Sequence, residues 1–177
     1  MIRAIARTLR RFGRRDDASA TVEFVILFPV FIVLMISGIE AGVLMTRQMM
    51  LERGLDITMR ALRLDQIPNP THDKVKAMIC QHSVIIPDCE NVVQLELSRV
   101  DTATFAMPLG TRQCVDRTGK IAPMITFSAG ARSELMMVRA CAVFDPMFPA
   151  TGLGLHLPKD ASGGYALIAT SGFVNEP

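Results

Sequence analysis

The residues that could carry chemistry are three histidines and four cysteines, and their spacing does not predict an active site. His72, His82 and His156 lie far apart in the chain. Cys80, His82 and Cys89 offer three zinc ligands, but a structural zinc site needs a fourth and usually places its cysteines closer together. We therefore predict that the protein binds no metal and no cofactor.

Nucleophilic and phosphate-binding motifs are also absent from the sequence. No serine lies in a Gly-x-Ser-x-Gly turn, and the glycines at 152–154 and 163–164 indicate turns rather than a phosphate loop before a helix. We predict no catalytic residue and a protein that is not an enzyme. The alternative is an anchored periplasmic enzyme or ligand-binding domain, with the segment 155–160, and His156 and Asp160 in it, as the candidate site.

The cysteines are better explained as disulfides. Cys80, Cys89, Cys114 and Cys141 all follow the long apolar run, so they lie on one side of a membrane if that run spans one. An even number on one side is typical of an oxidising compartment. Four cysteines allow three pairings, and we expect Cys80 with Cys89 and Cys114 with Cys141 because these pairs close short loops.

Positive charge is concentrated at the N-terminus. Residues 1–18 carry six arginines and two aspartates, a net +4 in a chain whose total is +2. The remainder is therefore slightly acidic, has no tryptophan and has one tyrosine, so we predict no nucleic-acid binding. Arginines beside an apolar run resist translocation, which predicts a cytoplasmic N-terminus.

The segment 24–45 is long and apolar enough to cross a membrane. It spans roughly 33 Å at about 1.5 Å per residue, against a hydrocarbon core of about 30 Å. Membrane helices tolerate a proline such as Pro29. Gly38 and Gly42 form a Gly-x-x-x-Gly face that another helix could approach closely, and Glu40 marks the outer lip of the segment.

The same helix is expected to continue beyond the membrane, over about residues 20–64. Leu44, Leu51, Leu55 and Leu62 recur on one side of a helix, which ends before the prolines at 68 and 70. Such a helix is roughly 67 Å long, so its outer half must pack on something. We expect the leucine stripe to pack on the C-terminal domain of the same chain, with a coiled coil to a partner as the alternative.

The segment 65–177 is predicted to form a small extracytoplasmic α+β domain. A helix is expected over 71–80 with Thr71 as its N-cap. Strands are expected over 93–98, over 135–144 as the central strand, and over 165–174. The segment 148–164 is predicted to be a loop. The fold class is a long transmembrane and amphipathic helix packed on a small antiparallel sheet.

Glu23 is an acid at the start of the apolar run, and two interpretations of it are open. In the first, its carboxylate reaches toward water at the cytoplasmic lip of the membrane. In the second, the chain is cut between Ala18 and Ser19, and Glu23 pairs with the new amino group of a neighbouring subunit. Such a pair would compensate both charges among apolar helices and fix the axial register of the subunits.

Residues 18–24 resemble the processing site of type IV prepilin-like proteins, which have a basic leader, a small residue and a glutamate at the fifth mature position. More narrowly, the chain resembles the TadE-like pseudopilins of the tight-adherence (Tad, or Flp) pilus system. This resemblance rests on Ala20-Thr21-Val22-Glu23-Phe24, Pro29, Gly38-Ile39-Glu40-Ala41-Gly42, Thr46-Arg47-Gln48, Val138-Arg139-Ala140-Cys141 and the segment 163–177. The family usually has glycine before the cut, where this chain has Ala18.

The resemblance implies a minor pilin or pseudopilin in the bacterial inner membrane, with its domain in the periplasm or in the extracellular pilus. A prepilin peptidase would remove the leader 1–18, leaving the helix 19–64 and the domain 65–177. Glu23 and Phe24 would act in assembly. Other pilins and pseudopilins and the assembly machinery would be its partners, and its function would be to help assemble Tad pili for adherence and biofilm formation.

Overall fold

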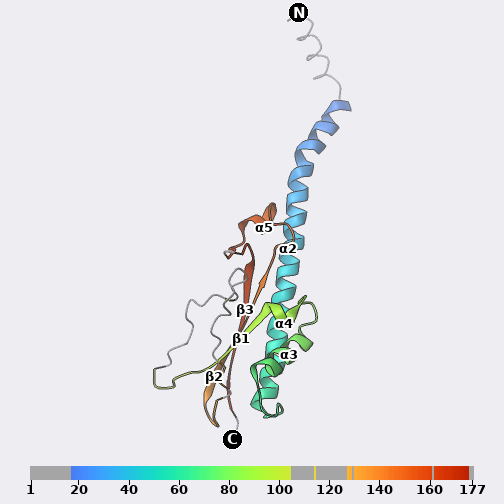
Figure 1. Ribbon diagram of the computed structural model, residues 1–177. Helices are drawn as coiled ribbons and strands as arrows, with labels where there is room; N and C mark the ends of the chain where they lie inside the picture. Colours follow the sequence, from blue (N-terminus) through green and yellow to red (C-terminus); the bar gives the residue numbers. More distant parts are fainter. Residues whose placement is uncertain (1–16, 105–113, 115–126, 129, 161, 176–177) are drawn as a thin grey trace, which may run out of the picture.

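The computed structural model describes residues 17–104, 114, 127–128, 130–160 and 162–175, and the side chains from residue 21 onward. One long helix, α2 (Asp17–Arg63), runs the length of the molecule, and a small α+β domain lies along its C-terminal half (Figure 1). This arrangement confirms the predicted fold class. The helix begins three residues earlier and ends one residue earlier than the sequence predicted, and Pro29 lies inside it.

The domain contains a three-stranded antiparallel sheet. Its strands are β1 (Val93–Arg99), β2 (Leu135–Phe144) and β3 (Tyr165–Val174), in the order β1-β2-β3. The apolar character of β2 correctly predicted the central strand. Arg139, its one charged residue, lies opposite Glu96 of β1, with Nη1 3.9 Å from the Glu96 Oε2 atom.

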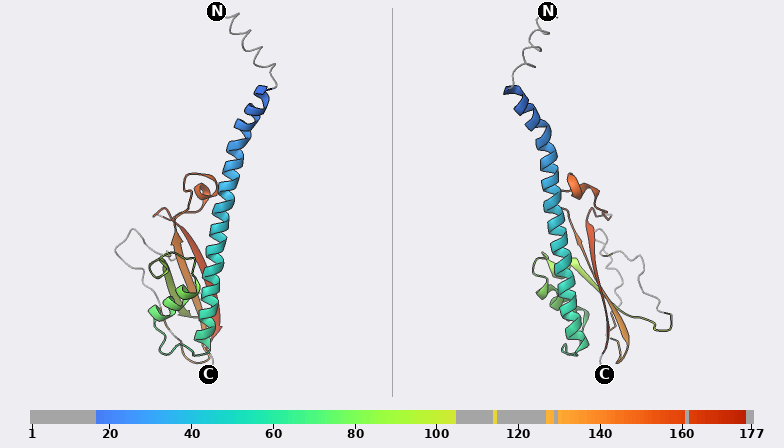
Figure 2. Two further views of the ribbon diagram at one scale, coloured as in Figure 1. Left: turned by 90° about the vertical axis from the view of Figure 1, so that its right-hand side faces the viewer. Right: turned by 180° about the vertical axis from the view of Figure 1, so that it is seen from behind.

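The core lies between one face of the sheet and one face of α2 (Figure 2). Three of the four leucines in the predicted stripe, Leu51, Leu55 and Leu62, are buried there, and Leu44 is partly buried. The stripe therefore packs on its own domain, as predicted. The sheet contributes alternate residues of each strand: Val93, Leu95, Leu97, Met136, Val138, Ala140, Ala142, Phe144, Tyr165, Leu167, Ala169 and Phe173.

Three short helices complete the described part of the domain. The helix α3 (His72–His82) was predicted, and its N-cap Thr71 accepts a hydrogen bond at Oγ1 from the Lys74 N–H at 3.4 Å. The helices α4 (Cys89–Val92) and α5 (Gly152–His156) were not predicted. The prediction of a loop over 148–164 is wrong at α5, because a single helical turn is too short to show a periodic pattern.

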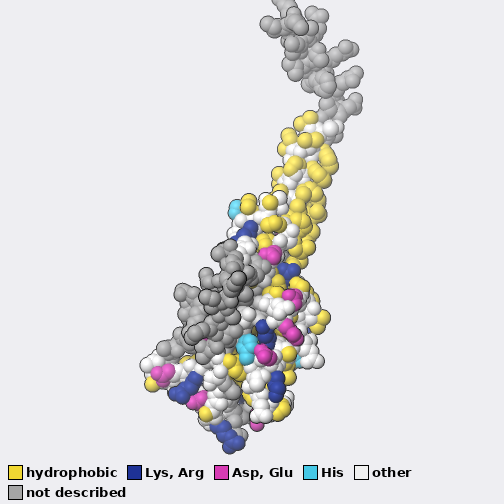
Figure 3. All heavy atoms as spheres, viewed as in Figure 1, with side chains coloured by type: hydrophobic (Ala, Val, Ile, Leu, Met, Phe, Trp, Pro, Cys, Tyr) yellow, Lys and Arg dark blue, Asp and Glu magenta, His cyan; other side chains and the backbone are white. Residues whose placement is uncertain are grey.

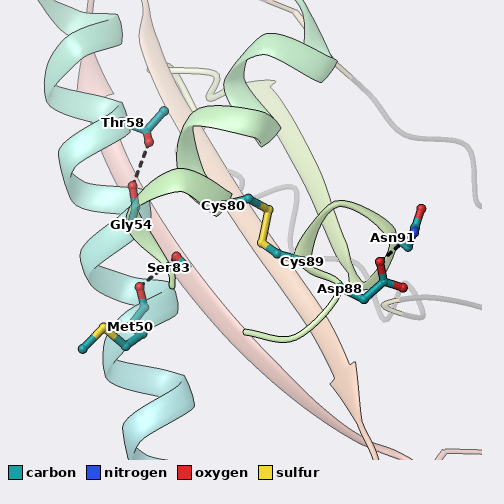
Figure 4. The surroundings of a disulfide bond; sticks show 8 residues. All are labelled: Met50, Gly54, Thr58, Cys80, Ser83, Asp88, Cys89 and Asn91. Carbon is teal, nitrogen blue, oxygen red and sulfur yellow. Dashed lines mark hydrogen bonds between the residues drawn. A yellow bond between two sulfur atoms is a disulfide. The ribbon is translucent and has the colours of Figure 1, made fainter. Parts of the chain in front are cut away.

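Helices α2 and α3 approach closely at Gly54 (Figure 4). The Ser83 hydroxyl after α3 donates to the Met50 carbonyl at 3.0 Å, and the buried Thr58 hydroxyl donates to the Gly54 carbonyl at 2.8 Å. A Cβ atom at Gly54 would contact the Ser83 Oγ atom and lie 2.8 Å from the Ile79 carbonyl oxygen. Only glycine fits this crossing without moving backbone.

Gly54→Ala should therefore destabilise the domain by about 1–3 kcal/mol, because overpacking outweighs the gain in helix propensity. Thermal unfolding of the full chain in detergent micelles measures this change. Gly42→Ala is the matched control, since a Cβ atom at Gly42 meets nothing within 4 Å. Equal midpoints for the two variants would contradict the close approach.

Candidate functional site

The N-terminal half of α2 is a candidate membrane span. Within the described part of the chain, one helix is long and apolar enough to cross a membrane, and its most apolar window has no buried residue. This surface forms a continuous hydrophobic column above the domain (Figure 3). An apolar helix that its own protein leaves uncovered is stable in lipid but not in water.

Hydrogen bonds join the domain to α2 at the lower end of this column, and we call this contact the clamp. The carboxylate of Glu40 accepts hydrogen bonds from the Met147 N–H and the Phe148 N–H, each at 3.1 Å. The Ser37 hydroxyl accepts one from the Leu153 N–H at 3.2 Å and donates to the Val33 carbonyl at 2.7 Å. Glu40 is only 1% exposed, so it faces the domain and serves as a structural hydrogen-bond acceptor.

Sequence reasoning missed this clamp. Ser37 and Glu40 are two polar residues one helical turn apart in an otherwise apolar run. That spacing is the only local signal that one face of the run meets a polar partner. The partner segment, residues 146–157, lies more than a hundred residues further along the chain, and we call it the α5 cap.

The opposite face of α2 carries a regular apolar stripe that the domain leaves bare. We call it the free stripe, and its residues are Phe24, Phe28, Phe31, Met35, Gly38, Gly42, Met45 and Met49, all exposed. They alternate at spacings of four and three residues, the repeat along which two helices pack side by side. Met45 and Met49, 63% and 66% exposed, lie below the level of Glu40, alongside the domain.

The predicted helix-packing residues belong to this stripe. A Cβ atom built at Gly38 or Gly42 meets nothing within 4 Å, so neither glycine is needed for packing within the chain. The predicted assembly residue Phe24 also lies on the stripe, with its ring stacked on Phe28 at 4.9 Å between centroids. The Gly-x-x-x-Gly face is thus available to a helix from outside the chain.

Glu23 and the predicted cut lie at the N-terminal end of α2. Glu23 is exposed, and the described residues offer it no hydrogen-bond or ion-pair partner. Ala18 and Ser19 have helical backbone within the first turns of α2, before the first described side chain. The two acids of the apolar run therefore differ: Glu40 is satisfied within the described chain, whereas Glu23 is not.

The four cysteines form two disulfides in the structure. Cys80 pairs with Cys89, and Cys114 pairs with Cys141, with Cα–Cα separations of 5.6 and 5.5 Å. This is the pairing that we expected from loop length. The first bond ties the end of α3 to the start of α4, and the second ties the segment after β1 to the central strand.

The histidines and Asp160 do not meet in one site. His72 contacts its neighbour Asp73, His82 ends α3, and His156 ends α5. No cluster of three or more His, Cys, Asp or Glu able to hold a metal occurs among the described residues. The Asp160 Oδ1 atom accepts hydrogen bonds from the Ser162 N–H at 2.8 Å and the Gly164 N–H at 3.1 Å, which assigns this carboxylate to the turn before β3.

Among the described residues of the domain, two groups have shifted pKa values. The Ala103 N–H, and then the Thr104 hydroxyl, donate to the Asp101 carboxylate and lower its pKa. Partial burial lowers the pKa of Lys76, and Asp73 and Glu90 nearby act in the opposite direction. Neither Lys76 nor Asp101 belongs to α2, so these pKa shifts change no charge on that helix.

A bare apolar helix that continues into a disulfide-bonded α+β domain is the arrangement expected of a single-pass membrane anchor. Residues 18–60 match the family model described as TadE-like protein. The match covers the membrane segment, the free stripe and most of the helix that the domain packs on. By this match α2 is a TadE-like segment, and TadE-like proteins are Tad pilus components rather than enzymes. Neither the curated proteins nor the solved structures contain a match.

Removing the Glu40 carboxylate should release the α5 cap from α2. Hydrogen bonds to charged groups each contribute about 1.5–3 kcal/mol, and Glu40→Ala removes two. We expect at least roughly tenfold faster hydrogen exchange in a peptide covering 146–153, measured by mass spectrometry. Glu52→Ala is the matched control, because this carboxylate is on the same helix, is exposed and bonds only locally to Gln48 in the contacts described. Unchanged exchange in Glu40→Ala would contradict the clamp.

Proposed function

We propose that this chain is a pseudopilin, or minor pilin, that helps to assemble Tad pili for adherence and biofilm formation. The observation that carries the proposal is the free stripe, which runs from the membrane segment to a part of α2 that lies beside the domain. The match of residues 18–60 to the TadE-like family supports it. Protein partners of the stripe would be helices of other Tad pilins and pseudopilins.

The proposed topology follows from charge and disulfides. The arginines before residue 16 remain in the cytoplasm, α2 crosses the bacterial inner membrane, and the domain 65–177 is periplasmic. Two disulfides in that domain suit an oxidising compartment. A prepilin peptidase on the cytoplasmic face cuts between Ala18 and Ser19, which leaves the helix 19–64 at the start of the mature chain.

Glu23 then acts as a contact between subunits. Its side chain has no partner among the described residues, and a carboxylate near an apolar helix bundle needs a compensating charge. After cleavage the amino group of Ser19 on a neighbouring subunit supplies one. Phe24, the next residue, begins the free stripe. The charge contact of Glu23 would fix the axial register of the subunits, and the adjoining apolar stripe would supply the buried area.

Glu23→Ala should abolish or strongly reduce assembly while it leaves membrane insertion and cleavage intact. Three measurements in the native host separate these steps: membrane fractionation, N-terminal sequencing with Ser19 expected as the first residue, and counts of surface pili. Glu52→Ala again controls for loss of an acid on α2. Normal pilus numbers in Glu23→Ala would refute the charge contact, and an uncut wild-type chain from Met1 would refute the processing step.

Leucine at Gly38 or Gly42 should block helix approach without disturbing the domain, because nothing in the chain lies within 4 Å of a Cβ atom there. We expect crosslinking through Met49→Cys to fall roughly tenfold, the equivalent of about 1.4 kcal/mol of lost packing. Ile39→Leu, at an exposed position off the stripe, is the control.

The identity of the crosslinked partner tests the proposal further. Bonds to other pilins or pseudopilins support it, whereas bonds only between copies of this chain indicate a structural dimer instead. Undiminished crosslinking in both glycine variants would show that the free stripe is not the contact.

A further inference from the structure

The part of α2 between Thr21, its first described side chain, and the domain is shorter than a membrane is thick. The domain first meets the helix where Gly152 packs against Val33 and Ser37. Residues 21–36 measure roughly 24 Å, whereas the hydrocarbon core is about 30 Å thick. A helix that enters at Thr21 needs about 20 residues to cross, which ends near Glu40, and a tilted helix needs more. For a helix that enters at Thr21, the outer edge of the hydrocarbon therefore falls where the domain begins, closer to the N-terminus than the end of the segment 24–45 expected from the sequence.

The α5 cap is held at this level by the clamp on Ser37 and Glu40. It lies at the end of the domain nearest the N-terminus of α2 (Figures 1 and 2). The clamp satisfies the Glu40 carboxylate with two backbone N–H groups and hides it from its surroundings. Polar groups near hydrocarbon must be satisfied within the protein, so this construction suits a position at the membrane boundary.

The outward surface of the α5 cap has the composition of an interfacial segment. Met147 and Leu155 project from it, 52% and 54% exposed. The α5 cap itself contains no acid, whereas Asp145 and Asp160 flank it, and the ammonium of Lys159 donates to the Pro149 carbonyl at 3.1 Å. Exposed apolar side chains in a segment without an acid among them favour the boundary between acyl chains and headgroups. In Figure 3 the hydrophobic column of α2 reaches the level of this cap.

We propose that the α5 cap is a second membrane contact, with Met147 and Leu155 inserted at the acyl–headgroup boundary of the outer leaflet that α2 crosses. The contact fixes the height and tilt of the domain on the membrane, because the cap is bonded to α2 at two points. This proposal requires that α2 spans a membrane, and it does not depend on assembly into pili.

The chain has no tryptophan, so a single introduced tryptophan reports its own surroundings. We compare Leu155→Trp in the full chain, reconstituted in phosphatidylcholine–phosphatidylglycerol vesicles with and without brominated acyl chains. Leu155→Trp should emit at shorter wavelength than in water, and brominated lipid should quench it. Phe31→Trp, within the span, should also be quenched, while Val84→Trp, 83% exposed between α3 and α4, should not.

Equal, unquenched emission from Leu155→Trp and Val84→Trp would overturn the proposal. A short emission wavelength without bromine quenching would also overturn it, in favour of a protein covering the cap. Absence of quenching in Phe31→Trp would show that α2 does not span the membrane. Pilus counts for Glu23→Ala are a separate readout, so failure of the proposed function and failure of this contact are distinguishable.

Discussion

The packing of one face of α2 on the sheet is the contact on which the rest of the molecule depends. Leu51 and Leu55 are fully buried in this contact. They pack the sheet on a helix whose formation is predicted by its local sequence pattern. Burial of an apolar side chain is favourable only where water is the alternative. The sheet therefore covers α2 below Glu40, whereas above Ser37 lipid can replace that cover and the side chains remain bare.

The sequence predicted the elements whose signal is local, and it could not predict contacts between distant segments. The boundaries of α2, the Thr71 cap and the central strand follow from periodicity and capping residues that lie side by side in the chain. The clamp from Glu40 to Met147 joins residues 107 positions apart, and a lone acid in an apolar run has several possible partners. The single turn of α5 is likewise ordered by tertiary contact with Ser37 rather than by helix propensity.

The two acids of the apolar run show how burial separates a structural role from an assembly role. Glu40 accepts hydrogen bonds from two backbone N–H groups of its own domain, and these satisfy its carboxylate. Glu23 has no such partner among the described residues, and the proposed partner is the amino group of a neighbouring subunit. A sequence cannot distinguish these cases, because both acids lie beside small and apolar residues.

Along the free stripe the driving force for helix association must change with depth. In the proposed topology the stripe faces lipid between Phe24 and Met35, and lipid is as apolar as a partner helix, so association there would depend on close packing and on the proposed Glu23 contact. Gly38 and Gly42 permit close approach at the boundary. Met45 and Met49 lie beyond it, and burying a methionine from water contributes about 1.5–3 kcal/mol. In the proposed assembly, the contribution of burial from water would therefore come from these two methionines, which lie just below the level of the α5 cap.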